Sequence, residues 1–194
     1  GNNFYCFKPT FIDIKELLKD PGEENELMVV VGSYSSLPDT IADGWDFEKT
    51  RYIPGIYDNV QLILADYPYI ENVQVVPEIK DKRIRVVVNT EYDGDRKPFK
   101  FRYLVREAVS GKLVTAGFTK ALTDPKQTDT VVLSIDLENC HLWTPEDPFL
   151  YNLDISTPGD NFSTRFGMRE FYFDTITRRA MLNGEPYYMR GTNV

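Results

Sequence analysis

The chain has 194 residues, of which 42% are hydrophobic and 13% aromatic, enough for one large or two small packed domains. Its 22 basic and 30 acidic residues give a net charge of -8, which disfavours nucleic acid and anionic membrane because no basic patch offsets the repulsion. There is no apolar run of bilayer length and no charged-then-apolar leader, so export would need a signal outside these residues.

The first third of the chain predicts one short helix and two strands. Residues 13–19 indicate a helix with Asp13 as its N-cap. The apolar residues 27–31 predict a strand, and residues 55–64 predict another. Between the strands, residues 32–54 form a loop of more than twenty residues. Loops of that length in a compact domain are usually functional or disordered.

Strand periodicity dominates residues 69–174, where we expect about seven strands. Tyr151, Leu153 and Ile155 alternate with polar neighbours, and residues 133–137 repeat the pattern. This period of two is typical of strands that bury one face. Gly, Pro and Asp turn signals separate the strands at short spacing. The region therefore predicts an all-β fold, a sandwich of antiparallel strands.

The last predicted element is a tight hairpin. Asn183-Gly184 suits both central positions of a two-residue type I′ turn, and the apolar residues 180–182 and 186–189 flank it. Arg190 to Val194 then follow with no helix and no polar tail. A hairpin followed by neither is an unusual end for a natural domain.

Four segments of the chain carry motifs: residues 11–27 (FIDIKELLKDPGEENEL), 54–62 (PGIYDNVQL), 142–153 (LWTPEDPFLYNL), and 166–170 (FGMRE) with 182–193 (LNGEPYYMRGTN). In this order they resemble landmarks of glycoside hydrolase family two, the β-galactosidase and β-glucuronidase family. The first two resemble the end of its jelly-roll domain, although Asp58 stands where that family usually has Arg. The third resembles a segment of its immunoglobulin-like sandwich, and the fourth, in two pieces, resembles the run-up to its catalytic (β/α)8 barrel and first barrel strand.

The resemblance implies a fragment with three parts. Residues 1–66 would be the C-terminal part of a jelly-roll domain of the galactose-binding kind. Residues 67–175 would be a complete immunoglobulin-like antiparallel β-sandwich. Residues 176–194 would be a hairpin and the first strand of a barrel that lies outside the chain. The resemblance leaves the oligomeric state open, because the family ranges from monomers to tetramers.

The chemistry implied by the resemblance lies outside these residues. Family members cleave a terminal β-linked sugar with retention, using two Glu residues of the barrel about 5 Å apart. No residue of the matching motifs is one of these carboxylates, so we predict no catalytic residue here and no hydrolysis by this chain alone. Its expected work in the parent glycosidase is to position the jelly-roll loop and to brace the barrel. The partner would be a carbohydrate, and a periplasmic or secreted location is favoured.

Two residues of the long loop are candidate substrate contacts. Asp46 resembles an Asp that holds a sugar hydroxyl at the barrel mouth in several family members, and Trp45 beside it has a ring that can stack on a sugar face. The competing interpretation is that Trp45 anchors the loop and Asp46 caps a turn.

Two further candidates lie near the end of the chain. Arg190 and Asn193 fall at the C-terminal end of the implied first barrel strand, where barrel active sites form. A structural role in closing the barrel competes with substrate contact for both residues.

The other reactive side chains predict structural roles. His141, the only histidine, has no second ligand at metal-binding spacing, so we expect a satisfied structural histidine and no metal site. Trp143 precedes Pro145, and we expect it to pack a strand entry rather than stack on a sugar. Cys6 and Cys140 lie too far apart to suggest a zinc site or a disulfide framework. No nucleophile elbow or phosphate-binding loop occurs, so no cofactor is expected.

Two other classes of protein stay open at this stage. One is a stand-alone β-sandwich module that binds carbohydrate or mediates adhesion, with Trp45, Tyr52 and Tyr67 as aromatic contacts. The other is an immunoglobulin-like spacer without a ligand. The predicted hairpin at Asn183-Gly184 argues against both, since neither needs a barrel entrance.

Overall fold

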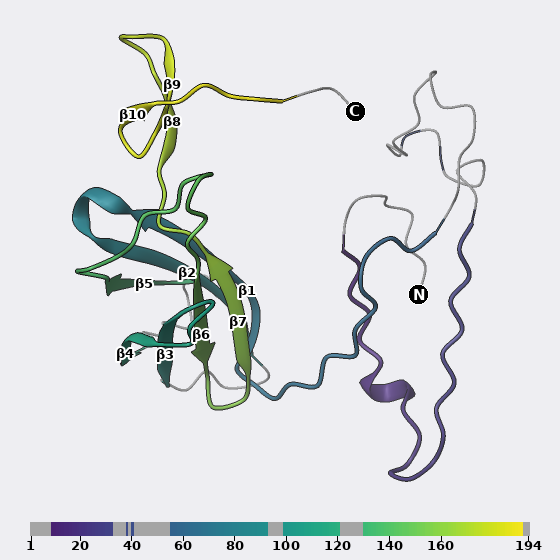
Figure 1. Ribbon diagram of the computed structural model, residues 1–194. Helices are drawn as coiled ribbons and strands as arrows, with labels where there is room; N and C mark the ends of the chain where they lie inside the picture. Colours follow the sequence, from purple (N-terminus) through teal and green to yellow (C-terminus); the bar gives the residue numbers. More distant parts are fainter. Residues whose placement is uncertain are drawn as a thin grey trace. The chain divides into compact units, whose positions relative to one another are not determined.

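The computed structural model describes residues 9–32, 38, 40, 55–92, 99–120 and 130–191, and Figure 1 shows their course. The chain divides into two compact units, Gly1–Leu62 and Ile63–Val194. Three of the candidate substrate contacts, Trp45, Asp46 and Asn193, lie outside the described residues. No helix in the described part is both long and apolar enough to cross a membrane.

The predicted helix over residues 13–19 is wrong in type and length. The structure has a single 3-10 turn, η1 (Lys15–Leu17), whose N-cap is Ile14. Asp13 Oδ1 instead accepts the N–H of Lys15 at 2.9 Å. None of the residues of η1 is buried, and a helix this short forms only where packing supports it.

Residues 27–31 and 55–64 are not strands in the structure, contrary to the sequence prediction. Their large apolar side chains, Val30 among them, are exposed. A strand needs a neighbouring strand to receive its backbone hydrogen bonds, and none in the described part of the chain pairs with these segments. Apolar composition alone therefore does not make either segment a strand.

The second unit contains the predicted sandwich, which the structure confirms. A three-stranded antiparallel sheet has the order β1 (Tyr69–Glu78), β2 (Arg83–Glu91) and β5 (Thr130–Asp136), with η3 (Ile79–Asp81) between β1 and β2. A four-stranded antiparallel sheet has the order β4 (Leu113–Lys120), β3 (Lys100–Glu107), β6 (Tyr151–Ser156) and β7 (Asn161–Phe166). Figure 1 shows the strands of this sandwich.

The core lies between the inner faces of these two sheets. The alternation predicted from the sequence is confirmed, because Tyr151, Leu153 and Ile155 are buried while their neighbours on β6 are not. Met168, just after β7, is also completely buried. The other large apolar members of the core are Ile70, Val73, Ile84, Val86, Val88, Phe99, Phe101, Val105, Leu133, Ile135, Leu137 and Phe166.

The turn between β6 and β7 fastens the segment that leads into β1. The Thr157 hydroxyl donates to the carbonyl of Pro68 at 2.6 Å, and Asp160 Oδ2 accepts the N–H of Ile70 at 2.9 Å. The carbonyl of Gly159 accepts the N–H of Asp66 at 2.9 Å. A Cβ on Gly159 would lie 2.5 Å from the carbonyl carbon of Asp66, so only glycine allows this close approach of two backbones.

A small third sheet, here called the C-terminal meander, follows the two sheets of the sandwich along the chain (Figure 1). It consists of β8 (Phe171–Asp174), β9 (Arg179–Leu182) and β10 (Glu185–Pro186) in the order β10-β9-β8. Asn183 and Gly184 have φ values of 53° and 87°, as a type I′ turn requires. The predicted hairpin is therefore confirmed, and β8 adds a third strand to it.

An aspartate orders the turn between β8 and β9. Asp174 accepts hydrogen bonds from the hydroxyl and the N–H of Thr177 and from the N–H of Ile176. The Thr177 hydroxyl has the largest effect, and together these donors hold the pKa of Asp174 below its ordinary value of 3.8. Ile176 itself lies exposed in this turn.

Replacing Gly159 with Ala should destabilise the second unit. We expect Gly159→Ala to lower the free energy of unfolding by about 1–3 kcal/mol, since the new Cβ has to displace backbone atoms of Asp66. Urea denaturation followed by circular dichroism measures this. Gly191→Ala is the matched control, because a Cβ there meets nothing within 4 Å. Equal stability of the two variants would contradict the prediction.

Removing the Thr177 hydroxyl should raise the pKa of Asp174 towards 3.8. Because the folded-state pKa is depressed, the turn contributes stability above pH 3.8 that is lost as the pH falls through the lower folded value. Carbon-13 NMR titration of the Asp174 carboxyl measures the shift in Thr177→Val. The control is Thr175→Val, which leaves the bonds to Asp174 in place. An unchanged midpoint in Thr177→Val would refute the assignment.

Candidate functional site

Arg190 is the one candidate substrate contact within the described residues. Its side chain is exposed. It makes no hydrogen bond or ion pair with any residue that the structure describes. A free guanidinium can form paired hydrogen bonds to a carboxylate or to sugar hydroxyls. Trp45, Asp46 and Asn193 lie outside the described residues, so their relation to Arg190 stays a prediction.

His141 is a satisfied structural residue, as the sequence predicts. Its Nε2 lies 2.6 Å from Asp147 Oδ2, and its ring stacks on Phe149 with centroids 4.5 Å apart. Its backbone N–H donates to the hydroxyl of Tyr151 at 2.7 Å. Burial raises the pKa of Tyr151, so this phenol stays protonated at neutral pH. Within the described residues, no group of His, Cys, Asp or Glu has the geometry of a metal site.

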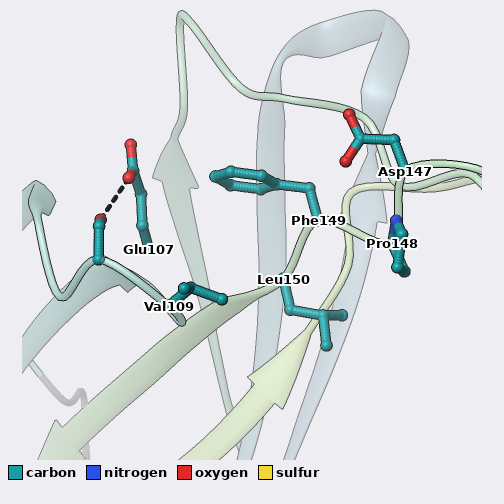
Figure 2. Close-up of a pocket in the computed structure, with 7 residues that line it drawn as sticks. Glu107, Val109, Asp147, Pro148, Phe149 and Leu150 are labelled. Carbon is teal, nitrogen blue, oxygen red and sulfur yellow. Dashed lines mark hydrogen bonds between the residues drawn. The ribbon is translucent and has the colours of Figure 1, made fainter.

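A shallow cavity lies beside this histidine. Its volume is about 350 Å³, and its lining residues are Glu107, Val109, Ser110, Asp147, Pro148, Phe149 and Leu150. Figure 2 shows the apolar side chains of Val109, Phe149 and Leu150 between the carboxylates of Glu107 and Asp147. Both carboxylates have partners, because Ser110 Oγ donates to Glu107 and His141 pairs with Asp147. The cavity thus offers an apolar surface and no free base or nucleophile.

A more extensive arrangement, the Trp143 joint, connects the sandwich to the meander. It consists of Trp143, Gly167, Met168, Arg169, Glu170 and Asn183, and so unites the third motif segment found in the sequence with both pieces of the fourth. The N–H of Trp143 donates to the carbonyl of Met168 at 2.9 Å, and Leu142 forms a parallel bridge with Met168. These contacts tie the segment before β6 to the segment after β7.

The Trp143 side chain is half-buried and is contacted by Arg169 and Gly167. The guanidinium carbon of Arg169 lies 4.5 Å from the ring centroid, a cation–π contact. Gly167 packs against the same side chain so closely that a Cβ there would lie 3.0 Å from Trp143 Cβ. The ring is therefore used in packing, as we predicted from the sequence, and Arg169 covers a face that sugar stacking would need.

Asn183 attaches the meander to this arrangement with three hydrogen bonds. Its Nδ2 donates to the carbonyl of Trp143 at 3.0 Å, and its Oδ1 accepts the N–H of Glu170 at 3.0 Å. Its backbone N–H donates to the carbonyl of Glu170 at 2.8 Å. The two bonds to Glu170 extend the β8–β9 pairing by one residue, and the bond to Trp143 ties this turn to the segment before β6.

Glu170 carries an unpaired oxygen in this joint. Its Oε2 is buried and has no hydrogen-bond partner among the residues that the structure describes, which is rare for a carboxylate. The side chain follows the buried Met168 and precedes β8, so the backbone of the joint fixes its place.

The sequence did not single out Glu170 or the side-chain role of Asn183. The motif letters contained both residues, but Asn183 was interpreted only as a turn residue. Asn is also the usual first residue of a type I′ turn, so its presence gave no signal of a further role for the side-chain amide. Nothing in one sequence names its partners, Trp143 and Glu170, because they lie 40 and 13 residues away.

Comparison with known proteins identifies a family whose match covers the sandwich and the first part of the joint. Residues 68–169, just over half of the chain, match the family described as Glycosyl hydrolases family 2. These residues run from the start of β1 to Arg169 in the Trp143 joint. The match thus spans the region that the structure folds as a seven-stranded sandwich.

Two curated relatives match nearly the whole chain. The chain is 27% identical to a β-galactosidase of Thermoanaerobacter pseudethanolicus over 201 residues, which is 96% of this chain and 25% of that protein. It is also 27% identical to a β-galactosidase of Thermoanaerobacterium thermosulfurigenes over 198 residues, 96% of this chain and 26% of that protein. The chain therefore spans about a quarter of the length of these relatives.

A solved structure matches the fold. It is a glycosyl hydrolase family 2 member from Bacteroides cellulosilyticus, superposed with a TM-score of 0.51 at 16% identity, over 63% of this chain and 18% of that one. At this identity the likeness concerns the fold alone. Since the family profile matches more than half of the chain, with a sandwich of the expected topology beneath it, this chain belongs to glycosyl hydrolase family 2.

Proposed function

We propose that the chain is a non-catalytic part of a retaining β-glycosidase, in which it positions a jelly-roll loop and braces a catalytic barrel. Family membership carries the proposal, because the relatives that match nearly the whole chain are β-galactosidases about four times its length. The proposed reaction is the hydrolysis of a terminal β-linked sugar, with β-galactosides as the first substrates to test. The boundaries proposed for the three parts are residues 1–66, 67–175 and 176–194.

The bracing role is supported by the surface of the C-terminal meander. Phe171 and Phe173 form an edge-to-face pair on one side of β8, and both are exposed. Tyr188 and Met189, just after β10, are exposed as well. Apolar side chains of this size usually mark a contact surface. In the proposed enzyme the barrel covers them.

The catalytic step itself belongs to the barrel. Retention requires two carboxyl groups about 5–5.5 Å apart, one acting as the nucleophile and the other as acid and then base. Such a pair tolerates little displacement relative to the substrate. The proposed role of the sandwich is to fix the distance and orientation between two other parts of the protein. Along the chain it lies between the jelly-roll part, which carries the loop, and the barrel, which carries the carboxylates.

Four residues are proposed to contact the sugar in the complete protein. Asp46 would accept a hydrogen bond from a sugar hydroxyl, and Trp45 would stack on the sugar face. Arg190 and Asn193 would lie at the mouth of the barrel. The exposed guanidinium of Arg190, without a partner in the described residues, is compatible with this role.

Hydrolysis should require the polypeptide that follows Val194. We expect the protein with its natural C-terminal continuation to release nitrophenol from an aryl β-galactoside, and the 194-residue chain to release none. A colorimetric assay measures the rate, and proton NMR of the first product anomer checks for retention. Activity in the 194-residue chain, or inactivity of the complete protein on a panel of aryl β-glycosides, would count against the proposal.

Removing the charge of Asp46 should weaken substrate binding in the complete protein. A hydrogen bond to a charged group is worth about 1.5–3 kcal/mol, so we expect Asp46→Asn to raise KM by roughly 10- to 100-fold with kcat little changed. Steady-state kinetics on the same substrate measure both constants. Asp43→Asn, in the same loop, is the matched control. A KM in Asp46→Asn no higher than that of the control would exclude the contact.

A further inference from the structure

The side chain of Asn183 does more than its position in a turn requires. Its φ of 53° serves the type I′ turn, which needs only the backbone conformation of this residue. Its amide nevertheless uses both of its polar atoms, Nδ2 on the carbonyl of Trp143 and Oδ1 on the N–H of Glu170. The two partners belong to segments that pair with each other through Met168.

This amide connects the meander to the most rigid part of the unit. Met168 is completely buried in the sandwich core, and its carbonyl holds the N–H of Trp143. Trp143 is held in turn by Gly167 and Arg169. A displacement of Asn183 would break bonds to two strand-like segments at once. The contacts therefore run without interruption from the core to the turn between β9 and β10.

Little else holds the meander to the sandwich at this end. Its exposed aromatic residues, Phe171 and Phe173, pair with each other, and the turn at Asp174 is satisfied within the meander. Glu170 Oε2 is buried and has no hydrogen-bond partner among the described residues, so that atom adds no hydrogen bond to the attachment. Among those residues, the hydrogen bond from Asn183 Nδ2 to the carbonyl of Trp143 is thus the polar connection between the meander and the segment before β6.

We infer that Asn183 is a positioning residue: its amide fixes the meander on the sandwich and so sets the direction in which residues 187–191 leave β10. The chain after β10 then starts from a fixed orientation and not from a flexible linker. The effect on activity rests on the proposed function, because it concerns the placement of the barrel relative to the jelly-roll loop. The effect on the joint does not rest on it.

Three variants separate the amide from the turn. Asn183→Asp keeps an acceptor for the N–H of Glu170 but loses the donor to Trp143, while Asn183→Gly loses both and keeps the positive φ. Gly184→Ala is the matched control, because it strains the same turn at a φ of 87° and its Cβ meets nothing within 4 Å. Only the first two variants remove the hydrogen bond from Asn183 to the carbonyl of Trp143.

Hydrogen exchange in the 194-residue chain tests the joint directly. The N–H of Glu170, which donates to Asn183 Oδ1, reports whether the amide bridges Glu170 and Trp143. We expect its protection factor to fall roughly tenfold in Asn183→Asp, which loses the bond to Trp143, and further in Asn183→Gly, which also loses the acceptor, in line with the net worth of one hydrogen bond per step. Amides of β3 and β6 should keep their protection in all variants. Unchanged protection at Glu170 in Asn183→Gly would overturn the inference.

Kinetics of the complete protein test the positioning role. We expect Asn183→Gly to raise KM for the aryl β-galactoside by about tenfold while kcat stays within about twofold, since the jelly-roll loop is displaced but the carboxylates within the barrel are not. A merely structural role would lower the amount of active enzyme and leave KM unchanged. A KM rise shared equally by Gly184→Ala would overturn the inference as well. If the wild-type protein hydrolyses no glycoside, the proposed function fails. Hydrogen exchange then still tests, by itself, whether the Asn183 amide attaches the meander to the sandwich.

Discussion

The burial of Met168 at the end of β7 is the constraint on which the C-terminal half of the second unit depends. Its side chain is part of the sandwich core, while its backbone carbonyl and bridge hold Trp143 and Leu142. One residue thus belongs both to the apolar core and to the polar joint. Close-packed cores do not deform continuously, so the Trp143 joint is held in place by its attachment to the sandwich core. The hydrogen bond from Asn183 to Trp143 attaches the meander to that joint.

The sandwich was predictable because its signal is local. Alternation on β6 and β5 identifies the inward residues Leu153 and Ile135 without knowledge of any partner strand. The β9–β10 hairpin was equally predictable, since Asn183-Gly184 nearly dictates its turn. The Trp143 joint was not predictable, because each of its bonds links residues that are far apart in the sequence and individually unremarkable. The unpaired Glu170 Oε2 is likewise a property of packing alone.

In the first unit, the strand predicted over residues 27–31 does not form. Residues 27–31 have the composition of a buried strand, yet Val30 is 86% exposed and forms no ladder in the described part of the chain. Strand propensity mainly measures how well a side chain fits a pleated, half-buried surface. That surface is made by neighbouring strands. A segment without them keeps the composition of a strand but not its hydrogen bonds, which is why the prediction failed here and succeeded in the sandwich.

A rigid joint has a larger mechanical effect than its few hydrogen bonds suggest. A strand advances about 3.3 Å per residue, so a small rotation at Asn183 grows into a displacement of ångströms over the five residues 187–191. In the proposed enzyme, such a displacement would move the barrel relative to the jelly-roll loop, while the two carboxylates within the barrel would keep their spacing. The proposed effect of Asn183 is therefore on where the substrate lies and not on the catalytic pair itself.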